Sequence, residues 1–92
     1  MPILSDLFIN GEWNVGTGRL AVHDPSDDSV ITEVATSDEA LCFKALDAAE
    51  AAAQSWAATP PRVRAEILRK AFEIMISEAD SLAELVTREN GK

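Results

Sequence analysis

The pattern of hydrophobic and polar positions divides the chain into two parts near residue 37. Before that point, short apolar runs alternate with polar residues and are separated by turn-forming residues, which is typical of β-strands. After it, apolar residues recur every three or four positions, which is typical of amphipathic helices. The pattern therefore predicts strands within about residues 7–34 and helices over about residues 38–56, 60–77 and 80–89.

The first two strands are predicted to form a hairpin. Leu7–Ile9 and Glu12–Val15 flank the dipeptide Asn10-Gly11. Both central positions of a type I′ turn need a positive φ, which asparagine and glycine tolerate. Two further strands are predicted at Arg19–His23 and Val30–Val34. The segment between them, Asp24–Ser29, is rich in turn-forming residues. Short antiparallel pairs of this kind are marginally stable in water, so we expect a second layer to cover them.

Polar residues mark the starts of the predicted helices. Thr36, Ser37 and Asp38 are all N-cap candidates for the first helix, and Thr36 with Glu39 matches a capping box. Thr59 is predicted to cap the second helix. At the other end, Asn90-Gly91 is a helix stop, because both residues tolerate the left-handed conformation in which helices commonly end.

The two long helices differ in the width of their apolar faces. The first has a narrow, alanine-rich stripe, and small residues there suggest close approach of a neighbouring element. The second has an apolar face that spans roughly half its circumference, wider than one small hairpin and one alanine helix can cover. Phe43 lies on the polar face of the first helix, where an aromatic residue suggests a further contact. The two faces consist of Leu41, Ala45, Ala48, Ala52 and Trp56, and of Val63, Ile67, Leu68, Ala71, Phe72, Ile74 and Met75.

Composition limits the chain to one small, acidic domain of 92 residues. Fifteen alanines inflate its 47% apolar fraction, so it holds one layer of packing and no enclosed substrate cavity. The net charge of −8 argues against nucleic-acid or anionic-membrane binding, since both favour basic surfaces. The single cysteine and the lack of a signal or membrane-spanning pattern predict a cytoplasmic, soluble protein.

Few residues form a pattern that could carry chemistry. Cys42 has no histidine nearby in the sequence, and acidic neighbours oppose a lowered thiol pKa, so a structural role is expected. His23 has no partner at ligand spacing, and the acidic turn after it lacks the glycine and glutamate of a calcium loop. A basic cluster on the second helix could receive an anion, but a solvated face or an inter-element salt bridge is the expected reading. This cluster consists of Arg62, Arg64, Arg69 and Lys70.

The tripeptide Asp80-Ser81-Leu82 matches the attachment site of the phosphopantetheine arm in acyl carrier proteins. In that family the serine opens a helix near the middle of the domain, with further helices after it. Here only eleven residues follow Ser81, and the front of the chain has a strand pattern. We therefore interpret Ser81 and Glu84 as an N-capping pattern for the third helix.

Read in order, four segments resemble the N-terminal part of an NAD(P)-dependent aldehyde dehydrogenase. They are "LFINGEW", "DPSDDSVITEV", "ALDAAEAAAQSWAATPPRVRAEILRKAFEIM" and "LAELVTRENGK", which together cover about residues 7–92. The amino-acid sequence from Ala45 to Glu73 is most similar to that of the succinate-semialdehyde dehydrogenase branch. Asp24 departs from the asparagine that the family usually has before proline, and Cys42 and Phe43 are unusual in the first helix.

The resemblance implies an α/β fold, of which this chain holds the N-terminal hairpin, strands and three helices of the cofactor-binding domain. It implies a whole enzyme that oxidises an aldehyde with NAD or NADP, and the expected aldehyde is succinate semialdehyde. The whole enzyme is expected to be a homodimer or homotetramer. The family's catalytic, cofactor-binding and oligomerisation parts lie beyond Lys92, so no residue of this chain is expected to be catalytic, to bind the cofactor or to ligate a metal through its side chain. The backbone carbonyls of Val22 and His23 map to a monovalent-cation site that some members have.

Two functional hypotheses follow. In the first, the chain is an inactive, structural piece of an aldehyde dehydrogenase whose partner is the remainder of the enzyme, and the helix stop at Asn90-Gly91 is an interruption within a longer chain. In the second, it is a stand-alone acidic interaction module that presents its spare apolar helix face to another protein. The second hypothesis predicts a monodisperse folded monomer, whereas exposed hydrophobic surface or self-association favours the first.

Overall fold

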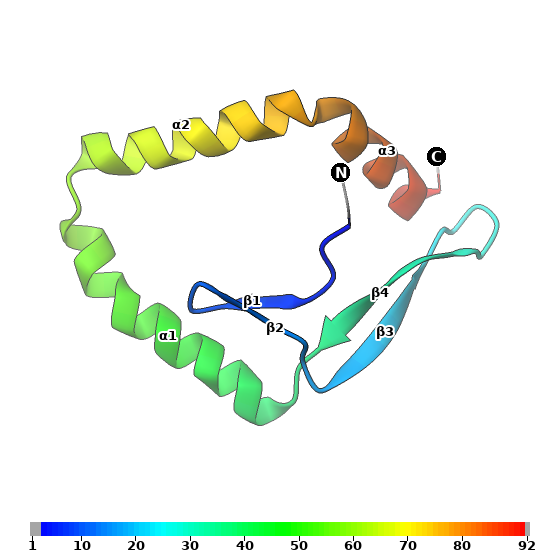
Figure 1. The fold of residues 1–92 in the computed structure, drawn as a ribbon, viewed down its shortest axis with the longest axis horizontal. Helices are drawn as coiled ribbons and strands as arrows, with labels where there is room; N and C mark the ends of the chain where they lie inside the picture. The colour runs from blue at the N-terminus through cyan, green and yellow to red at the C-terminus, as the bar shows by residue number, and fades with distance from the viewer. Residues whose placement is uncertain (1–2, 92) are drawn as a thin grey trace.

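The computed structural model describes residues 3–91 and shows strands followed by helices, as the pattern predicts. Figure 1 shows these elements arranged around an open ring, with the two hairpins and α1 along one side and α2 and α3 along the other. The elements are β1 (Leu7–Ile9), β2 (Glu12–Asn14), β3 (Gly18–His23), β4 (Val30–Thr36), α1 (Glu39–Ala58), α2 (Pro61–Ser77) and α3 (Ala79–Asn90). The α/β fold class is as the sequence predicts.

The β1–β2 hairpin forms around the predicted turn. Asn10 and Gly11 have φ values of 52° and 76°, as a type I′ turn requires. Phe8 lies opposite Trp13 in the antiparallel register, and their rings meet edge to face with centroids 4.9 Å apart. The second strand ends at Asn14 and not at Val15, because the Asn14 side chain accepts a hydrogen bond from the Gly16 backbone and turns the chain.

The second hairpin, β3–β4, is also antiparallel and pairs Leu20 with Val34. Strand β4 is longer than predicted, because it continues beyond Val34 to Thr36. Gly16 has φ of +74°, and a Cβ there would lie 2.5 Å from the Thr36 carbonyl oxygen, so only glycine fits this close approach. The segment before β1 lies along β4, since the Ser5 carbonyl accepts a hydrogen bond from the Ala35 backbone.

The caps correct three sequence predictions. Asp38 is the N-cap of α1, and its carboxylate accepts a hydrogen bond of 2.8 Å from the Leu41 backbone. The capping box at Thr36 is wrong, because Thr36 belongs to β4 and cannot turn toward the helix. Thr59 is wrong as the cap of α2: it ends α1, donating its hydroxyl to the Ser55 carbonyl, and Pro60 takes the N-cap position. Ser81 is wrong as the cap of α3, which begins two residues earlier.

The end of α3 closes the ring against the β3–β4 turn. Gly91 adopts the left-handed conformation with φ of 72°, and its backbone N–H donates to the Thr87 carbonyl, as the predicted helix stop requires. A Cβ at Gly91 would lie 3.0 Å from the Ser26 backbone nitrogen and 3.2 Å from the Pro25 side chain. Lys92, the last residue of that predicted stop, lies outside the described residues.

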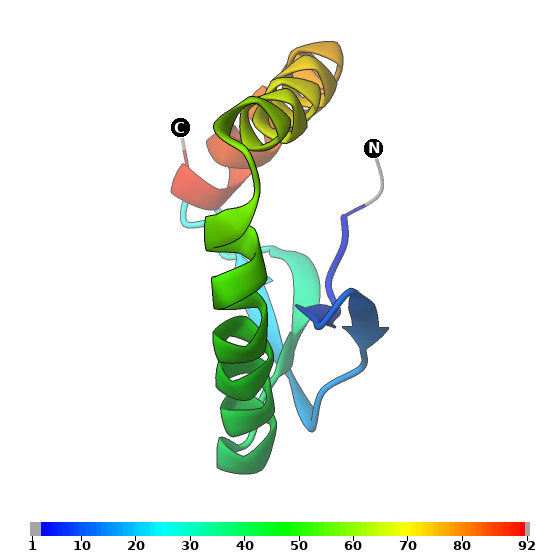
Figure 2. The ribbon, with the colours of Figure 1, turned by 90° about the vertical axis from the view of Figure 1, so that its left-hand side faces the viewer.

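The ring buries very little of its apolar surface. Ala35, which is 8% exposed, is the one buried hydrophobic residue among those that the structure describes. The accessible surface is 7272 Å², whereas a folded monomer of 9.9 kDa exposes about 5,200 Å². The radius of gyration is 16.5 Å, against about 12 Å for a compact domain of this length. Figure 2 shows the ring edge-on as a thin layer, and its shortest dimension is 17 Å.

Candidate functional site

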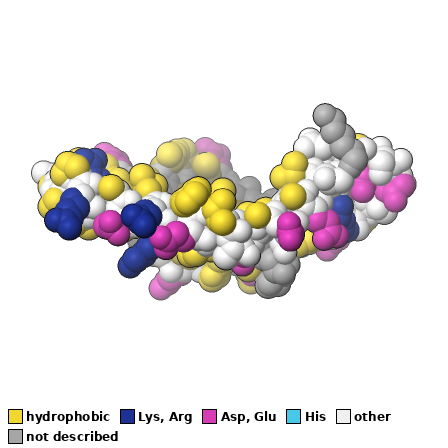
Figure 3. Space-filling view, turned by 90° about the horizontal axis from the view of Figure 1, so that it is seen from above, with side chains coloured by type: hydrophobic (Ala, Val, Ile, Leu, Met, Phe, Trp, Pro, Cys, Tyr) yellow, Lys and Arg dark blue, Asp and Glu magenta, His cyan; other side chains and the backbone are white. Residues whose placement is uncertain are grey.

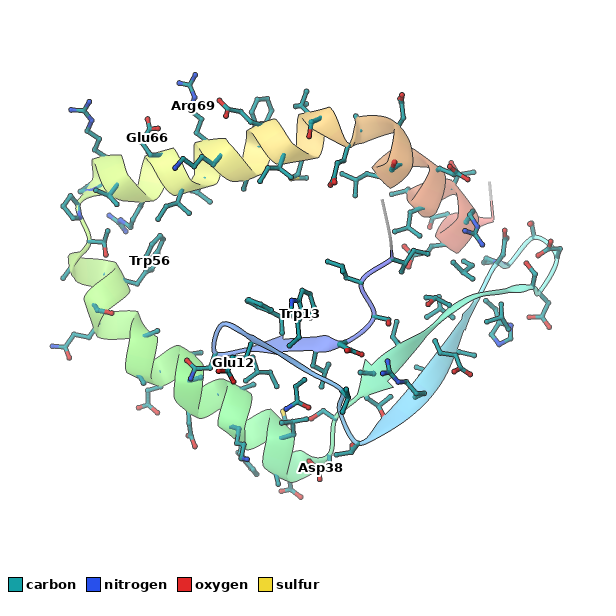
Figure 4. The ribbon with its side chains drawn as sticks, viewed as in Figure 1. Glu12, Trp13, Asp38, Trp56, Glu66 and Arg69 are labelled. Carbon is teal, nitrogen blue, oxygen red and sulfur yellow. The ribbon has the colours of Figure 1, made fainter. Side chains whose placement is uncertain are left out.

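The side of α2 that faces the ring opening is apolar. Figure 4 shows Glu66 and Arg69 of α2 pointing away from the opening, while Trp13 and Trp56 point into it. Successive residues of a helix are rotated by about 100°, so the opposite side of α2 faces the opening. That side carries Ile67, Leu68, Ala71 and Met75. Together with Trp13 and Trp56, these residues are called the inner apolar face.

The inner apolar face is open to solvent in this chain. Leu68 and Met75 are 67% and 60% exposed, and Trp13 is 54% exposed. Monomeric proteins rarely expose contiguous apolar patches beyond a few hundred Å², and larger ones mark interaction surfaces. The large apolar residues of the predicted α2 face are exposed, so the hairpins and α1 leave this face uncovered.

The alanine-rich stripe of α1 does find a neighbour. The turn of the β1–β2 hairpin lies over it, with Ile9 and Gly11 against Ala45, Ala48 and Ala52 around a shallow groove of about 390 Å³. Small side chains on the helix allow the hairpin to approach closely, as the sequence predicts. Phe43, on the polar face of α1, is 54% exposed, so the further contact that its position suggests stays a prediction.

Arg64 is the residue of α2 that departs from this pattern. It is the one α2 residue that is not exposed, although it is charged and its apolar neighbours Ile67 and Leu68 are open to solvent. Its Nε atom is buried and has no hydrogen-bond partner within residues 3–91. Arg64 is one member of the basic cluster predicted from the sequence. Its spacing of three, four and seven residues from Ile67, Leu68 and Ala71 places it on the inner side of the helix.

The remaining basic residues of the cluster lie on a charged outer surface. Figure 3, which looks down on α2, shows basic, acidic and hydrophobic side chains intermixed. Arg69 pairs with Glu73 at 3.2 Å, and both side chains are more than half exposed. Across the described residues, no ion pair forms between Glu66 and Lys70, which also stand at helical spacing. An exposed pair of this kind contributes little to stability.

The other candidate residues do not assemble into a reactive site. Cys42 is a free, exposed thiol near the start of α1. The His23 Nδ1 atom lies 3.1 Å from the Asp28 carbonyl oxygen and 3.5 Å from the Asp28 carboxylate. The imidazole therefore contacts the turn that follows it in the sequence. Within residues 3–91, no group of three or more His, Cys, Asp or Glu side chains could hold a metal ion. The cation site at the Val22 and His23 carbonyls stays a prediction.

The β3–β4 turn lowers the pKa of one of its own carboxyl groups, that of Asp27. The Asp27 carboxylate accepts hydrogen bonds from the hydroxyl and the backbone N–H of Ser29, at 2.7 and 3.0 Å. These bonds, the hydroxyl bond first, lower the pKa of Asp27 below its ordinary value, and the charge of Arg88 on α3 adds to the effect. The turn chemistry predicted for Asp24–Ser29 is confirmed, since Asp24 binds Ser26 in the same way.

The joint between β4 and α1 lacks the features of a glycine-rich phosphate loop. A dinucleotide site needs a glycine-rich turn between a strand and a helix, with the helix N-terminus free to bind the pyrophosphate. The strand-to-helix joint of this chain, from β4 to α1, consists of Ser37 and Asp38. The Asp38 carboxylate occupies the N-terminus of α1, and Glu39 adds a second negative charge in the first turn. Both charges oppose phosphate binding there.

The family is established by comparison with known proteins. The model of the aldehyde dehydrogenase family matches residues 13–92 of this chain. The chain therefore belongs to the aldehyde dehydrogenase family, an oxidoreductase family whose members generally use NAD or NADP. No helix within residues 3–91 is long and apolar enough to cross a membrane.

Relatives of this chain are semialdehyde dehydrogenases that act on different substrates. A malonate-semialdehyde dehydrogenase from Bacillus pumilus is 39% identical over 87 residues, covering 92% of this chain and 18% of the relative. A glutarate-semialdehyde dehydrogenase from Pseudomonas putida is 38% identical over 87 residues, with the same two coverages. A succinate-semialdehyde dehydrogenase from Paenarthrobacter nicotinovorans is 53% identical over 58 residues, covering 63% of this chain and 12% of the relative. The chain thus spans less than a fifth of the length of these relatives.

Proposed function

We propose that this chain is an N-terminal, structural part of the cofactor-binding domain of an NAD(P)-dependent semialdehyde dehydrogenase. The observation that carries the proposal is the inner apolar face, which is solvent-exposed although the chain belongs to a family of much longer enzymes. In this account the remainder of the enzyme covers the face. The whole enzyme is a cytoplasmic homodimer or homotetramer, and residues 1–92 alone have no activity.

In this proposal the chain positions other parts of the enzyme and takes no part in the chemistry itself. Cys42 is a free, exposed thiol with no histidine nearby in the sequence, so the nucleophile that the family uses is taken to be a different cysteine. The Asn10-Gly11 turn, the Asp38 cap of α1 and the Gly91 stop of α3 define the local ends of these elements. In this account the segment packs as an outer layer against the dinucleotide-binding sheet, and the remainder of the enzyme supplies catalysis.

We further propose succinate semialdehyde as the substrate of the whole enzyme. The similarity to the Paenarthrobacter nicotinovorans enzyme supports this choice, and the malonate and glutarate enzymes are the alternatives within the same class. All three substrates carry an aldehyde at one end and a carboxylate at the other. Assaying the whole enzyme with the three semialdehydes tests the choice: succinate semialdehyde should give the highest kcat/KM.

A chimeric enzyme tests the structural role. In it, this chain replaces the matching segment of the Bacillus pumilus malonate-semialdehyde dehydrogenase, whose own activity provides the assay. We expect the chimera to reduce the nicotinamide cofactor with malonate semialdehyde, and the same relative without its matching segment to be inactive. Turnover by residues 1–92 alone, or an inactive and unfolded chimera, would overturn the proposal. A stable, monodisperse monomer of the isolated chain favours the stand-alone interaction module instead.

A further inference from the structure

We infer that the segment that covers the inner apolar face carries a carboxylate that pairs with the Arg64 guanidinium. The inference rests on the proposed function, because it takes the remainder of the enzyme as the covering segment. It adds to that proposal the chemistry of one specific contact. The contact lies near the start of α2, close to the corner where α1 and α2 meet.

The burial of Arg64 gives the first reason. Its Nε atom is shielded from water and has no acceptor within residues 3–91. A buried donor without a partner costs the full desolvation of that group, and the cost is larger for a charged group. Native proteins satisfy nearly all such groups. The Nε–H of Arg64 therefore requires an acceptor that the described residues do not supply.

The surroundings of Arg64 give the second reason, because they favour a full negative charge. Covering the inner apolar face removes water from around Ile67, Leu68 and Arg64 together, which leaves the arginine charge in an apolar environment. A buried charge is tolerated when it is paired and hydrogen-bonded. The first turn of α2 also contains no acidic residue that could balance Arg62 and Arg64. A carboxylate satisfies both the charge and the hydrogen-bonding geometry, since the guanidinium fork binds it in a bidentate manner.

Area considerations identify the occupant as the rest of the enzyme. The chain exposes about 2,000 Å² more surface than a compact monomer of its mass, from 7272 Å² against about 5,200 Å². A standard protein–protein interface buries only about 800 Å² on each partner. The excess corresponds to the contact between parts of one domain, and the relatives contain more than four-fifths of their length outside the matched segment.

The chimera described above allows a direct test with matched variants. Arg64→Met keeps the apolar stem and removes the charge, and Arg62→Met makes the same change on an exposed residue of the same helix turn. We expect Arg64→Met to lower the midpoint of thermal unfolding by about 5 °C and Arg62→Met by less than about 1 °C. Arg64→Lys should fall between wild type and Arg64→Met, because it keeps the charge but loses the fork.

The pH dependence separates a carboxylate from a backbone carbonyl. In Arg64→Met a partner carboxylate is left buried without its cation, which raises its pKa, so protonation at lower pH relieves the penalty. The difference in unfolding midpoint between wild type and Arg64→Met should therefore shrink between about pH 8 and about pH 5, the range over which such a buried carboxyl titrates. A difference that does not change with pH contradicts the carboxylate.

The outcomes distinguish this inference from the proposed function. If the chimera with Arg64 is inactive and unfolded, the proposed function itself fails. If the chimera is active but Arg64→Met is as stable as Arg62→Met, the proposed function stands and the inference fails. A more stable Arg64→Met chimera would also contradict the inference, because it would show that Arg64 contributes only its aliphatic stem.

Discussion

The Cβ position of Gly91 lies 3.0 Å from the backbone nitrogen of Ser26, so the end of α3 rests directly on the β3–β4 turn. These residues are 65 positions apart in the sequence, from 26 to 91, and their contact closes the ring (Figure 1). The Arg88 charge acts on Asp27 across the same junction. The glycine of the helix stop therefore has two tasks: it adopts a positive φ, and it leaves room for the turn.

Gly91→Ala should destabilise the chimera by about 2 kcal/mol, since the left-handed conformation costs an L-residue about 1–2 kcal/mol and the new methyl group would also meet Ser26 and Pro25. Gly11→Ala is the matched control. Gly11 has a similar φ of +76°, but nothing lies within 4 Å of its Cβ position, so it reports the backbone strain alone. Thermal unfolding of the two variants gives the comparison. Equal midpoints would show that α3 does not rest on the turn.

The N-cap of α1 can be tested in a peptide that spans residues 36–59, because the helix is rich in alanine and long enough to form partly in isolation. Asp38→Ala should lower its helix content, corresponding to a loss of about 1 kcal/mol, because the bond to the Leu41 backbone is lost. Thr36→Ala should leave the helix content unchanged. Circular dichroism measures both. A larger effect at Thr36 would restore the capping box that the structure contradicts.

The lowered pKa of Asp27 makes the β3–β4 turn sensitive to acid. A carboxyl group whose folded pKa lies below its unfolded value of 3.8 stabilises the fold above that value, and the stabilisation is lost as the pH falls through the folded pKa. Ser29→Ala removes the hydroxyl that is the main cause of the shift. We expect the Asp27 pKa, followed by carboxyl-detected NMR of the chimera, to move up toward its ordinary value in this variant. An unchanged pKa would assign the shift to another group.

Local chemistry explains which parts of the fold could be predicted from the sequence. Asn10-Gly11 and Asn90-Gly91 determine backbone conformations by themselves, and both turns form as expected. The N-cap of α1 is harder to predict, because Thr36, Ser37 and Asp38 are all good N-cap residues. Only the strand pairing of Thr36 with Gly18 removes one of the three. In the same way, Thr59 reads as a cap for α2 but ends α1 instead.

The arrangement of the elements and the role of Arg64 depend on contacts that a periodicity argument does not contain. The alanine stripe of α1 indicates close approach, but nothing in its pattern names the β1–β2 hairpin as the neighbour. By charge alone, Arg64 belongs with Arg62 and Arg69. Its spacing from Ile67, Leu68 and Ala71 was the signal that places it on the apolar side.

Cysteine labelling tests the central claim, that the remainder of the enzyme covers the inner apolar face. Leu68→Cys places a thiol on this face and Glu66→Cys places one on the outer side of the same helix, both in a Cys42→Ala background. Maleimide labelling, read position by position from peptide masses, compares the isolated chain with the chimera. We expect both thiols to react in the isolated chain and only the thiol at position 66 to react in the folded chimera. Equal labelling of both positions in an active chimera would contradict the account.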